Sequence, residues 1–352
     1  MNSVLRALIL MALVLLYHRP ALTQEVSQES PGRYSTRDIS ASTPMGSGNG
    51  VLVRAASTLR GELVITAADS PRVSVIYRKL AKTQQKSRAV DYIDLIAVAL
   101  NRAPTGARLD LRAPNPPPWE DNEYGMVQAE LIIPPDCSVE IDAAYFDVFA
   151  SGPFSEFVNS TSLGRLEVSG VKERLKLVTA NRRVAVEDAR GDIWVSTTNS
   201  TLIAKDIECH SSPATFRNEG GDISIERITG EVNIKNSYGR IDIDGLSLAG
   251  DKGYIRCRSG PIVVFLGDIG DGQLLINNHY DDIEITVPAG LSAVLSLSVD
   301  EGGKIEAVGF PFRTELVQST RLSLVAGWGG GLISSSVRGR GNIFVRGIDE
   351  GD

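Results

Sequence analysis

The sequence predicts an all-β protein, namely a parallel β-solenoid (β-helix) with rungs of about 18–21 residues that follows an N-terminal β region. Apolar residues occur as doublets separated by one residue, which is the period of a β-strand. The leading residues of successive doublets stand at 184, 193, 202, 216 and 223, and the same steps recur at 223, 232, 241, 255 and 262. A short unit that recurs at a fixed period and cannot bury its own apolar face indicates a solenoid. The recurring positions are Val184/Val186, Ile193/Val195, Leu202/Ala204 and Phe216, then Ile223/Ile225, Val232/Ile234, Ile241/Ile243 and Ile255/Cys257.

Glycine before many of the doublets is the third observation. It supplies the backbone freedom that a tight corner needs before each strand. The shorter step, as from 184 to 193, holds a short strand and its corner and leaves no room for an amphipathic helix. We therefore expect consecutive strands on alternating faces of a flattened coil, with two steps to a rung. The signature occurs in 164–168, 191–195, 221–225, 230–234 and 239–243.

Residues 1–23 have the pattern of a signal peptide. Arg6 precedes an apolar run over 7–17 and small residues follow it, so we expect cleavage after Thr23. The run over 7–17 is too short to span a bilayer, which disfavours an uncleaved anchor. No later stretch could cross a membrane as a helix. The expected location is the periplasm, the cell surface or the extracellular space.

The rest of the chain divides by composition and pattern. We expect a flexible linker at 24–49, where Ser, Thr, Gly and Gln are frequent, and a short tail at 348–352. Between them, an N-terminal β region at 50–140 leads into the solenoid at 141–347. Strands are expected in that region at 51–53, 62–65, 72–77, 96–100 and 129–133, with a helical turn before 96 as an open alternative.

Three cysteines, Cys137, Cys209 and Cys257, lie in the expected mature chain. An odd number leaves at least one unpaired. We interpret them as small buried apolar residues rather than as disulfide partners. Because the chain contains no CxxC, the sequence does not favour a zinc or redox site.

Several segments together resemble a known group of proteins. They are the strand and turn that begin Ile132-Ile-Pro-Pro-Asp-Cys, the series of Gly-Asp-Ile and Gly-x-Val strands, and Ile285-Thr-Val-Pro-Ala-Gly. The chain from about 50 to 347 resembles the bacterial putative-adhesin family of exported, single-layer β-solenoid envelope proteins. The resemblance implies this fold and an envelope location, and it transfers no catalytic residue to any position here.

The search for catalytic and metal-binding patterns finds little. The expected mature chain has two histidines, His210 and His279, and contains none of the sequence motifs of serine hydrolases, zinc proteases or nucleotide-binding loops. We therefore predict no catalytic residue, no metal site and no cofactor. Residues 277–282 could bind a cation through His279, Asp281 and Asp282, but a polar corner before the next strand is favoured. Asp192 and Asp222 hold equivalent corner positions and are interpreted in the same way.

Charge supplies the one functional signal. The net charge of −7 argues against nucleic-acid binding. If the coil has two faces, outward residues separate by sign. One face collects Glu167, Glu187, Lys205, Glu226, Asp242, Asp244 and Glu284. The candidate binding stripe on the other face is Lys176, Trp194, Arg217, Lys235, Arg256 and Arg258, with Glu219 as the exception.

These observations predict a non-enzymatic, exported β-solenoid that presents a long surface for binding or self-association in the bacterial envelope. The basic stripe suits an anionic envelope polymer or the acidic face of a second molecule. Two alternatives stay open. One is a carbohydrate-active β-helix enzyme, which would need clustered carboxylates and aromatic residues in a groove. The other is a solenoid that polymerises end to end through an uncapped rung, although Gly327–Gly331 is a candidate cap.

Overall fold

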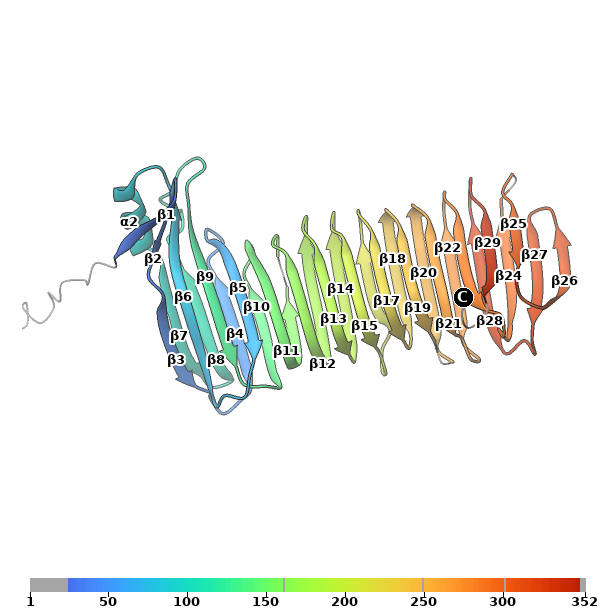
Figure 1. Cartoon of the computed structure of the whole chain (residues 1–352), viewed down its shortest axis with the longest axis horizontal. Helices are drawn as coiled ribbons and strands as arrows, with labels where there is room; N and C mark the ends of the chain where they lie inside the picture. Colours follow the sequence, from blue (N-terminus) through green and yellow to red (C-terminus); the bar gives the residue numbers. More distant parts are fainter. Residues whose placement is uncertain (1–24, 161, 249, 301, 349–352) are drawn as a thin grey trace, which may run out of the picture.

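The computed structural model describes residues 25–348, apart from 161, 249 and 301. The expected signal peptide and residues 349–352 of the expected tail lie outside this part of the chain. The described chain is one elongated stack of strands with a helix at its N-terminal end (Figure 1). Its 29 described strands form a single continuous sheet around a common core, so the predicted β-solenoid is confirmed.

Rungs of two strands make up the centre of the stack. Each strand from β13 to β21 pairs in parallel with the strand two places later, so successive strands lie on opposite faces. The pairs Val184↔Leu202 and Leu202↔Ile223 have the alternating rung lengths that the sequence predicts. Face A contains β13 (Val184–Arg190), β15 (Leu202–Glu208), β17 (Ile223–Thr229), β19 (Ile241–Ser247), β21 (Ile262–Asp268) and β23 (Ile283–Pro288). Face B contains β14 (Asp192–Thr198), β16 (Ala214–Asn218), β18 (Val232–Tyr238), β20 (Lys252–Ser259) and β22 (Gln273–Asn278).

Both faces continue without a break toward the N-terminus. The first halves of β11 (Phe146–Asn159) and β12 (Leu166–Ala180) pair on face A, and their second halves pair on face B. Face A then runs through β5 (Arg60–Ala67), β9 (Tyr124–Ile133) and β6 (Arg72–Lys82). Face B runs through β10 (Cys137–Asp142), β4 (Gly50–Ala55), β8 (Gly106–Arg112) and β7 (Ala97–Ala103). The expected division at 140/141 thus lies within one continuous core.

The apolar doublets supply the core. All the doublet residues of the repeated unit, from Val184 to Ile243, are 2% exposed or less. Residues between them, such as Trp194 and Asn233, are at least partly exposed. A strand with period two buries every second side chain, and here both faces bury that set against each other.

Face A has a third inward position that the doublets did not reveal. The strands bend at a residue with positive φ, and the chain turns its next side chain into the core. These bends are at Gly170 (φ 73°), Asp188 (49°), Asp206 (54°), Arg227 (57°) and Gly245 (81°). The buried residues that follow them are Val171, Ala189, Ile207, Ile228 and Leu246. The added residue is a bulge-like kink that breaks the strict alternation.

The segment expected to be a flexible linker is instead ordered. It contains β1 (Val26–Ser30), β2 (Arg33–Thr36) and β3 (Ile39–Pro44), and both β2 and β3 pair antiparallel with β6. The polar composition suggested a linker, but β6 is long and has an edge that would otherwise be unpaired, and β2 and β3 pair with it. Backbone hydrogen bonding to this edge stabilises the strands despite their polar side chains.

The helix α2 (Lys86–Asp94) takes the place of the helical turn left open before 96, and β7 is the strand expected after it. Its buried residues Ala89, Tyr92 and Ile93 pack with Val26 and Tyr34 of β1 and β2. The helix and these strands therefore cover the N-terminal end of the stack (Figure 1).

The C-terminal strands do not follow chain order. β28 (Gly331–Val337) inserts between β22 and β24 (Ala293–Val299), and β29 (Ile343–Ile348) inserts between β23 and β25 (Ile305–Val308). The coil thus reaches the expected end near 347, but its last strands lie inside the stack. Beyond β24, face B is extended by the antiparallel strands β27 (Arg321–Ala326) and β26 (Phe312–Gln318).

Candidate anion-binding surface

Three basic residues form one column on face B. Arg217, Lys235 and Arg256 are direct register partners in β16, β18 and β20, and all three are exposed. Neighbouring strands are about 4.8 Å apart, so three positive charges stand in line across three successive rungs.

The other predicted stripe residues lie in adjacent columns of the same face. Lys176 pairs with Trp194, two residues nearer the start of their strands, and its Nζ is 5.6 Å from the Trp194 ring centroid. Arg258 lies two residues beyond Arg256, with its guanidinium carbon 6.0 Å from the centroid of the Tyr238 ring. The expected single stripe is therefore three parallel columns. Each strand has several outward positions, and the sequence pattern alone did not assign each residue to one of them.

A small pocket continues the basic column. It has a volume of about 170 Å³ and lies where β20, β22 and β28 meet. Its lining includes Arg256, Asn277, His279, Ser336 and Arg338, and no carboxylate lines it. Ser336 Oγ donates to Asn277 Oδ1 at 2.6 Å, which leaves the Nδ2 group of Asn277 as a donor. Two guanidinium groups and this amide suit a carboxylate, phosphate or sulfate group.

Sequence reasoning missed Ser336 and Arg338. They reach the pocket because β28 pairs with β22, and Asn277 and Ser336 are register partners across that long connection. The backbone N–H of Arg338 donates to Asn278 O at 3.0 Å, which holds the arginine beside the pocket. The only available signal was the run of alternating residues over 331–337, and it does not say which strand will be the partner.

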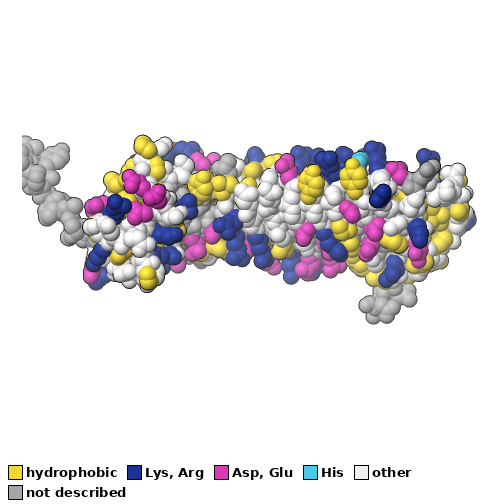
Figure 2. Space-filling model, turned by 90° about the horizontal axis from the view of Figure 1, so that it is seen from above, with side chains coloured by type: hydrophobic (Ala, Val, Ile, Leu, Met, Phe, Trp, Pro, Cys, Tyr) yellow, Lys and Arg dark blue, Asp and Glu magenta, His cyan; other side chains and the backbone are white. Residues whose placement is uncertain are grey.

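Face A and face B differ in how their charges are compensated. On face A, Arg240 Nε lies 3.0 Å from Asp242 Oδ2, and Lys205 Nζ lies 3.6 Å from Glu226 Oε1. Among the described residues, by contrast, no salt bridge involves Arg217, Lys235 or Arg256. Figure 2 shows basic side chains gathered along one long edge of the C-terminal half and a mixture of both signs along the other.

A column of inward-facing polar residues lies on the core side of the strands that carry the basic column. Arg217 and Lys235 are each followed by a buried asparagine, Asn218 and Asn236, in the same register. Asn236 Nδ2 donates to the carbonyls of Gly221 and Gly239 at 2.9 and 3.1 Å. Such bonds tie successive corners together and hold the outward residues in place. The column also contains Thr197, Cys257 and Asn278.

The cysteines are buried and free, as the interpretation of small apolar residues requires. Cys257 occupies the asparagine column, and its Sγ donates to Gly239 O at 3.4 Å. Burial raises the pKa of the Cys257 and Cys137 thiols to about 11. Both are therefore overwhelmingly protonated at neutral pH.

The corner carboxylates bind backbone of neighbouring rungs. Asp222 Oδ1 accepts from the Arg240 N–H at 2.8 Å, and Asp281 Oδ2 accepts from the Gly260 N–H at 2.6 Å. Asp282 Oδ1 accepts from the Asn342 N–H at 2.7 Å. These bonds support the interpretation of 277–282 as a polar corner. In the part of the chain that the structure describes, no group of three potential metal-ligating side chains occurs.

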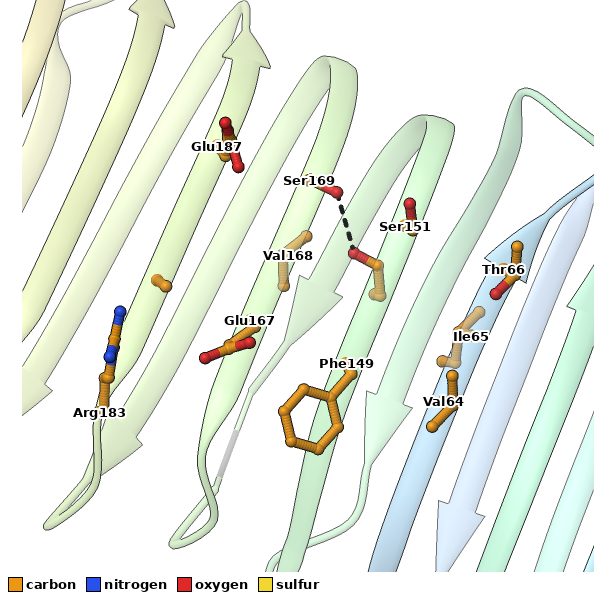
Figure 3. Close-up of a pocket in the computed structure, with 12 residues that line it drawn as sticks. Val64, Ile65, Thr66, Phe149, Ser151, Glu167, Val168, Ser169, Arg183 and Glu187 are labelled. Carbon is orange, nitrogen blue, oxygen red and sulfur yellow. Dashed lines mark hydrogen bonds between the residues drawn. The ribbon is translucent and has the colours of Figure 1, made fainter.

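A second hollow, of about 370 Å³, lies on face A over β5, β11, β12 and β13 (Figure 3). Its small side chains include Ser151 and Ser169, and Phe149, Glu167 and Glu187 are among the larger ones. Glu167 also forms a salt bridge with Arg165, which lies in the corner just before β12. One of the two lining glutamates is thus already partnered, which does not favour a pair of catalytic carboxylates.

Among the residues that the structure describes, no helix is long and apolar enough to cross a membrane.

Comparison with known proteins gives structural likenesses only. No family model matches the sequence, and no curated protein matches it. A putative cell adhesion protein from Clostridium sporogenes ATCC 15579 aligns at 7% identity and a TM-score of 0.22, over 89% of this chain and 100% of its own. A putative adhesin from Bacteroides fragilis NCTC 9343 aligns at 9% identity and a TM-score of 0.28, over 88% and 97%.

A putative adhesin from Parabacteroides distasonis ATCC 8503 aligns at 9% identity and a TM-score of 0.29, over 88% of this chain and 97% of its own. All three names belong to the group that the sequence resembles. At these identities and TM-scores the likeness supports no argument about function, which rests instead on the residues of this chain.

Proposed function

We propose that this chain is an exported, non-enzymatic, adhesin-like β-solenoid that binds an anionic polymer of the bacterial envelope along face B. The observation that carries the proposal is the column Arg217–Lys235–Arg256, which has three like charges in register and ends at a pocket with a further arginine, Arg338. The signal-peptide pattern over 1–23 supports export.

Electrostatics favours a polymer over a single small anion. Like charges on adjacent strands repel each other, and bound anionic groups relieve that repulsion. A polymer with a carboxylate or phosphate on each repeat unit can contact several rungs at once, so that weak individual contacts add up. The acidic balance of the whole chain, −7, keeps such binding local to this surface.

The tyrosines beside the column suit a carbohydrate component of the polymer. Tyr238 and Tyr254 are exposed on face B, and Tyr254 also lines the pocket. An exposed aromatic ring next to a cation can stack against a sugar while the cation binds its acidic group. Trp194 has the same kind of arrangement, because the Lys176 ammonium lies over its ring.

The test is binding to immobilised alginate and to immobilised polyphosphate, one a carboxylate polymer and the other a phosphate polymer. The triple variant Arg217→Glu, Arg256→Glu and Arg258→Glu should lose binding, because the column becomes negative. Binding by the parent protein should weaken from about 0.1 M to about 1 M salt, since the screening length falls from about 10 Å to about 3 Å.

The matched control carries the same change in charge elsewhere. Arg60, Arg72 and Arg182 are exposed and lie outside face B, and their triple substitution by Glu should leave binding unchanged. Equal loss of binding in both triple variants would mean that net charge alone matters. Binding that survives in the face B variant, with an unchanged melting temperature, would contradict the proposal.

A further inference from the structure

The two ends of the stack differ. At the N-terminal end α2 packs on β1, β2 and β6, and β3 contacts β7 across the end, which closes the core. At the C-terminal end face B extends through β27 and β26, whereas face A stops at β25. The inner side of the β26–β27 hairpin therefore has no opposing strand among the described residues.

Apolar side chains are exposed at the C-terminal end of the stack. Every residue of β26 is exposed, including Phe312 (39%), Leu316 (40%) and Val317 (72%). Val308 of β25 is 43% exposed at the same end. Apolar side chains grouped at one end of a protein are characteristic of a protein–protein contact.

β26 also has an unpaired edge. It pairs with β27 on one side, and no other described strand pairs with it. Its backbone N–H and C=O groups on the outer side can therefore accept another strand. Soluble proteins usually protect such edges with charges and bulges, and β26 has Arg313, Glu315 and an irregularity between Thr314 and Leu316.

The order of residues in β26 makes it complementary to itself. In an antiparallel pair of two copies centred on Thr314, Arg313 lies opposite Glu315. Opposite charges are favourable between directly opposed residues. Moving the centre to Glu315 would place two glutamates face to face, so charge selects the first register.

We propose that two copies of this chain associate end to end through their C-terminal ends, with β26 of one antiparallel to β26 of the other. The contact is isologous, because each copy offers the same strand, so assembly stops at a dimer. The closed N-terminal end prevents growth into a filament. The two-fold axis that relates the paired strands is perpendicular to their sheet, so face B of both copies lies on the same side.

Within a monomer, Arg313 Nη2 lies 3.6 Å from Glu315 Oε1 of its own chain. In the dimer each side chain exchanges this partner for the equivalent one on the other copy. Since both are exposed, neither substitution below removes a buried contact of the monomer.

The experiment is sedimentation velocity of the purified protein over a range of concentrations. The parent should form a dimer of twice the chain mass. Arg313→Glu and Glu315→Arg, each alone, should weaken the dimer at least tenfold, because like charges then meet. An equimolar mixture of the two variants should restore association as a heterodimer. The double variant, in which the two charges are exchanged, should form a homodimer like the parent.

Replacing exposed apolar residues by lysine supplies a second test and its control. Val317→Lys should abolish the dimer, whereas Trp328→Lys, in the turn before β28 and 99% exposed, should leave it intact. Melting temperatures should match the parent in all variants at a concentration where it is monomeric. A parent that is monomeric at all concentrations, a dimer that ignores both charge reversals, or assembly beyond two copies would each overturn the proposal.

Discussion

The guanidinium of Arg227 lies against the carboxylate of Asp206 in the preceding rung, with Nε 2.6 Å from Oδ1 and Nη2 3.1 Å from Oδ2. Both residues have positive φ, 57° and 54°, at the bend of face A. In the next rung the same position is Gly245. A pair of charged side chains thus joins two bends whose backbone conformation glycine adopts without strain.

This pair predicts a pH dependence. Hydrogen bonding to Arg227 holds the pKa of Asp206 below its ordinary value of 3.8. A carboxyl whose pKa is lower in the folded state stabilises the fold above the unfolded pKa, and this contribution is lost as pH falls through the folded pKa. Arg227→Gln should therefore raise the Asp206 pKa measured by NMR. The difference in stability from the parent should shrink below about pH 4, and a pKa unchanged by the substitution would show that the pair does not form.

The inward position of Val232 predicts a large loss of stability for Val232→Asp. This residue is 2% exposed in the middle of the repeated unit, so the substitution buries an unpaired carboxylate. The carboxyl group is then driven to its neutral form, and burying it without a partner should cost about 2–7 kcal/mol of unfolding free energy, measured by urea denaturation. Asn233→Asp, one residue further and partly exposed, is the matched control and should change stability by less than about 0.5 kcal/mol. Similar losses in both variants would show that charge rather than burial is responsible.

The asparagine column predicts opposite results at two neighbouring positions. Asn236→Leu leaves the carbonyls of Gly221 and Gly239 with one donor fewer and should destabilise by about 1–3 kcal/mol. Cys257 occupies the next rung, with only a weak Sγ donor on Gly239 O. Cys257→Asn restores the donor found in neighbouring rungs and should match or exceed the parent in thermal stability. A clear drop in melting temperature for Cys257→Asn would mean that this rung is too narrow for an amide.

The central coil could be predicted from sequence because its signals are local. Ile223 and Ile225 alternate with polar residues, Gly221 precedes their strand and Gly230 precedes the next one, so period and corner are both visible. The bends at Asp206 and Arg227 were not visible, since residues other than glycine rarely adopt positive φ. Of the five bend positions, only 170 and 245 are glycines, so the sequence of any one of the other rungs does not indicate its bend.

The two ends and the full extent of the basic surface could not be predicted for a different reason. Strand partners there are set by which edge remains open, as when β28 pairs with β22 rather than with the strand before it in the chain. Residues 26–44 are mostly polar, yet β2 and β3 form on the edge that β6 offers, and β1 pairs with β2. Arg338 joined the basic surface through the same kind of long-range pairing. The six predicted residues lie on one face, and their function stays a prediction.

The pocket at the end of the basic column predicts a distinct role for Arg338. It shares the lining with Arg256 and Asn277, so an anionic group there can receive charge-assisted hydrogen bonds from several donors. Arg338→Ala should weaken binding to alginate or polyphosphate about tenfold, which corresponds to about 1.4 kcal/mol. Arg340→Ala is the matched control, because Arg340 is exposed two residues away and does not line the pocket. Isothermal titration at low and high salt measures both. If the two variants lose the same affinity, the pocket adds nothing beyond general positive charge, and binding rests on the column alone.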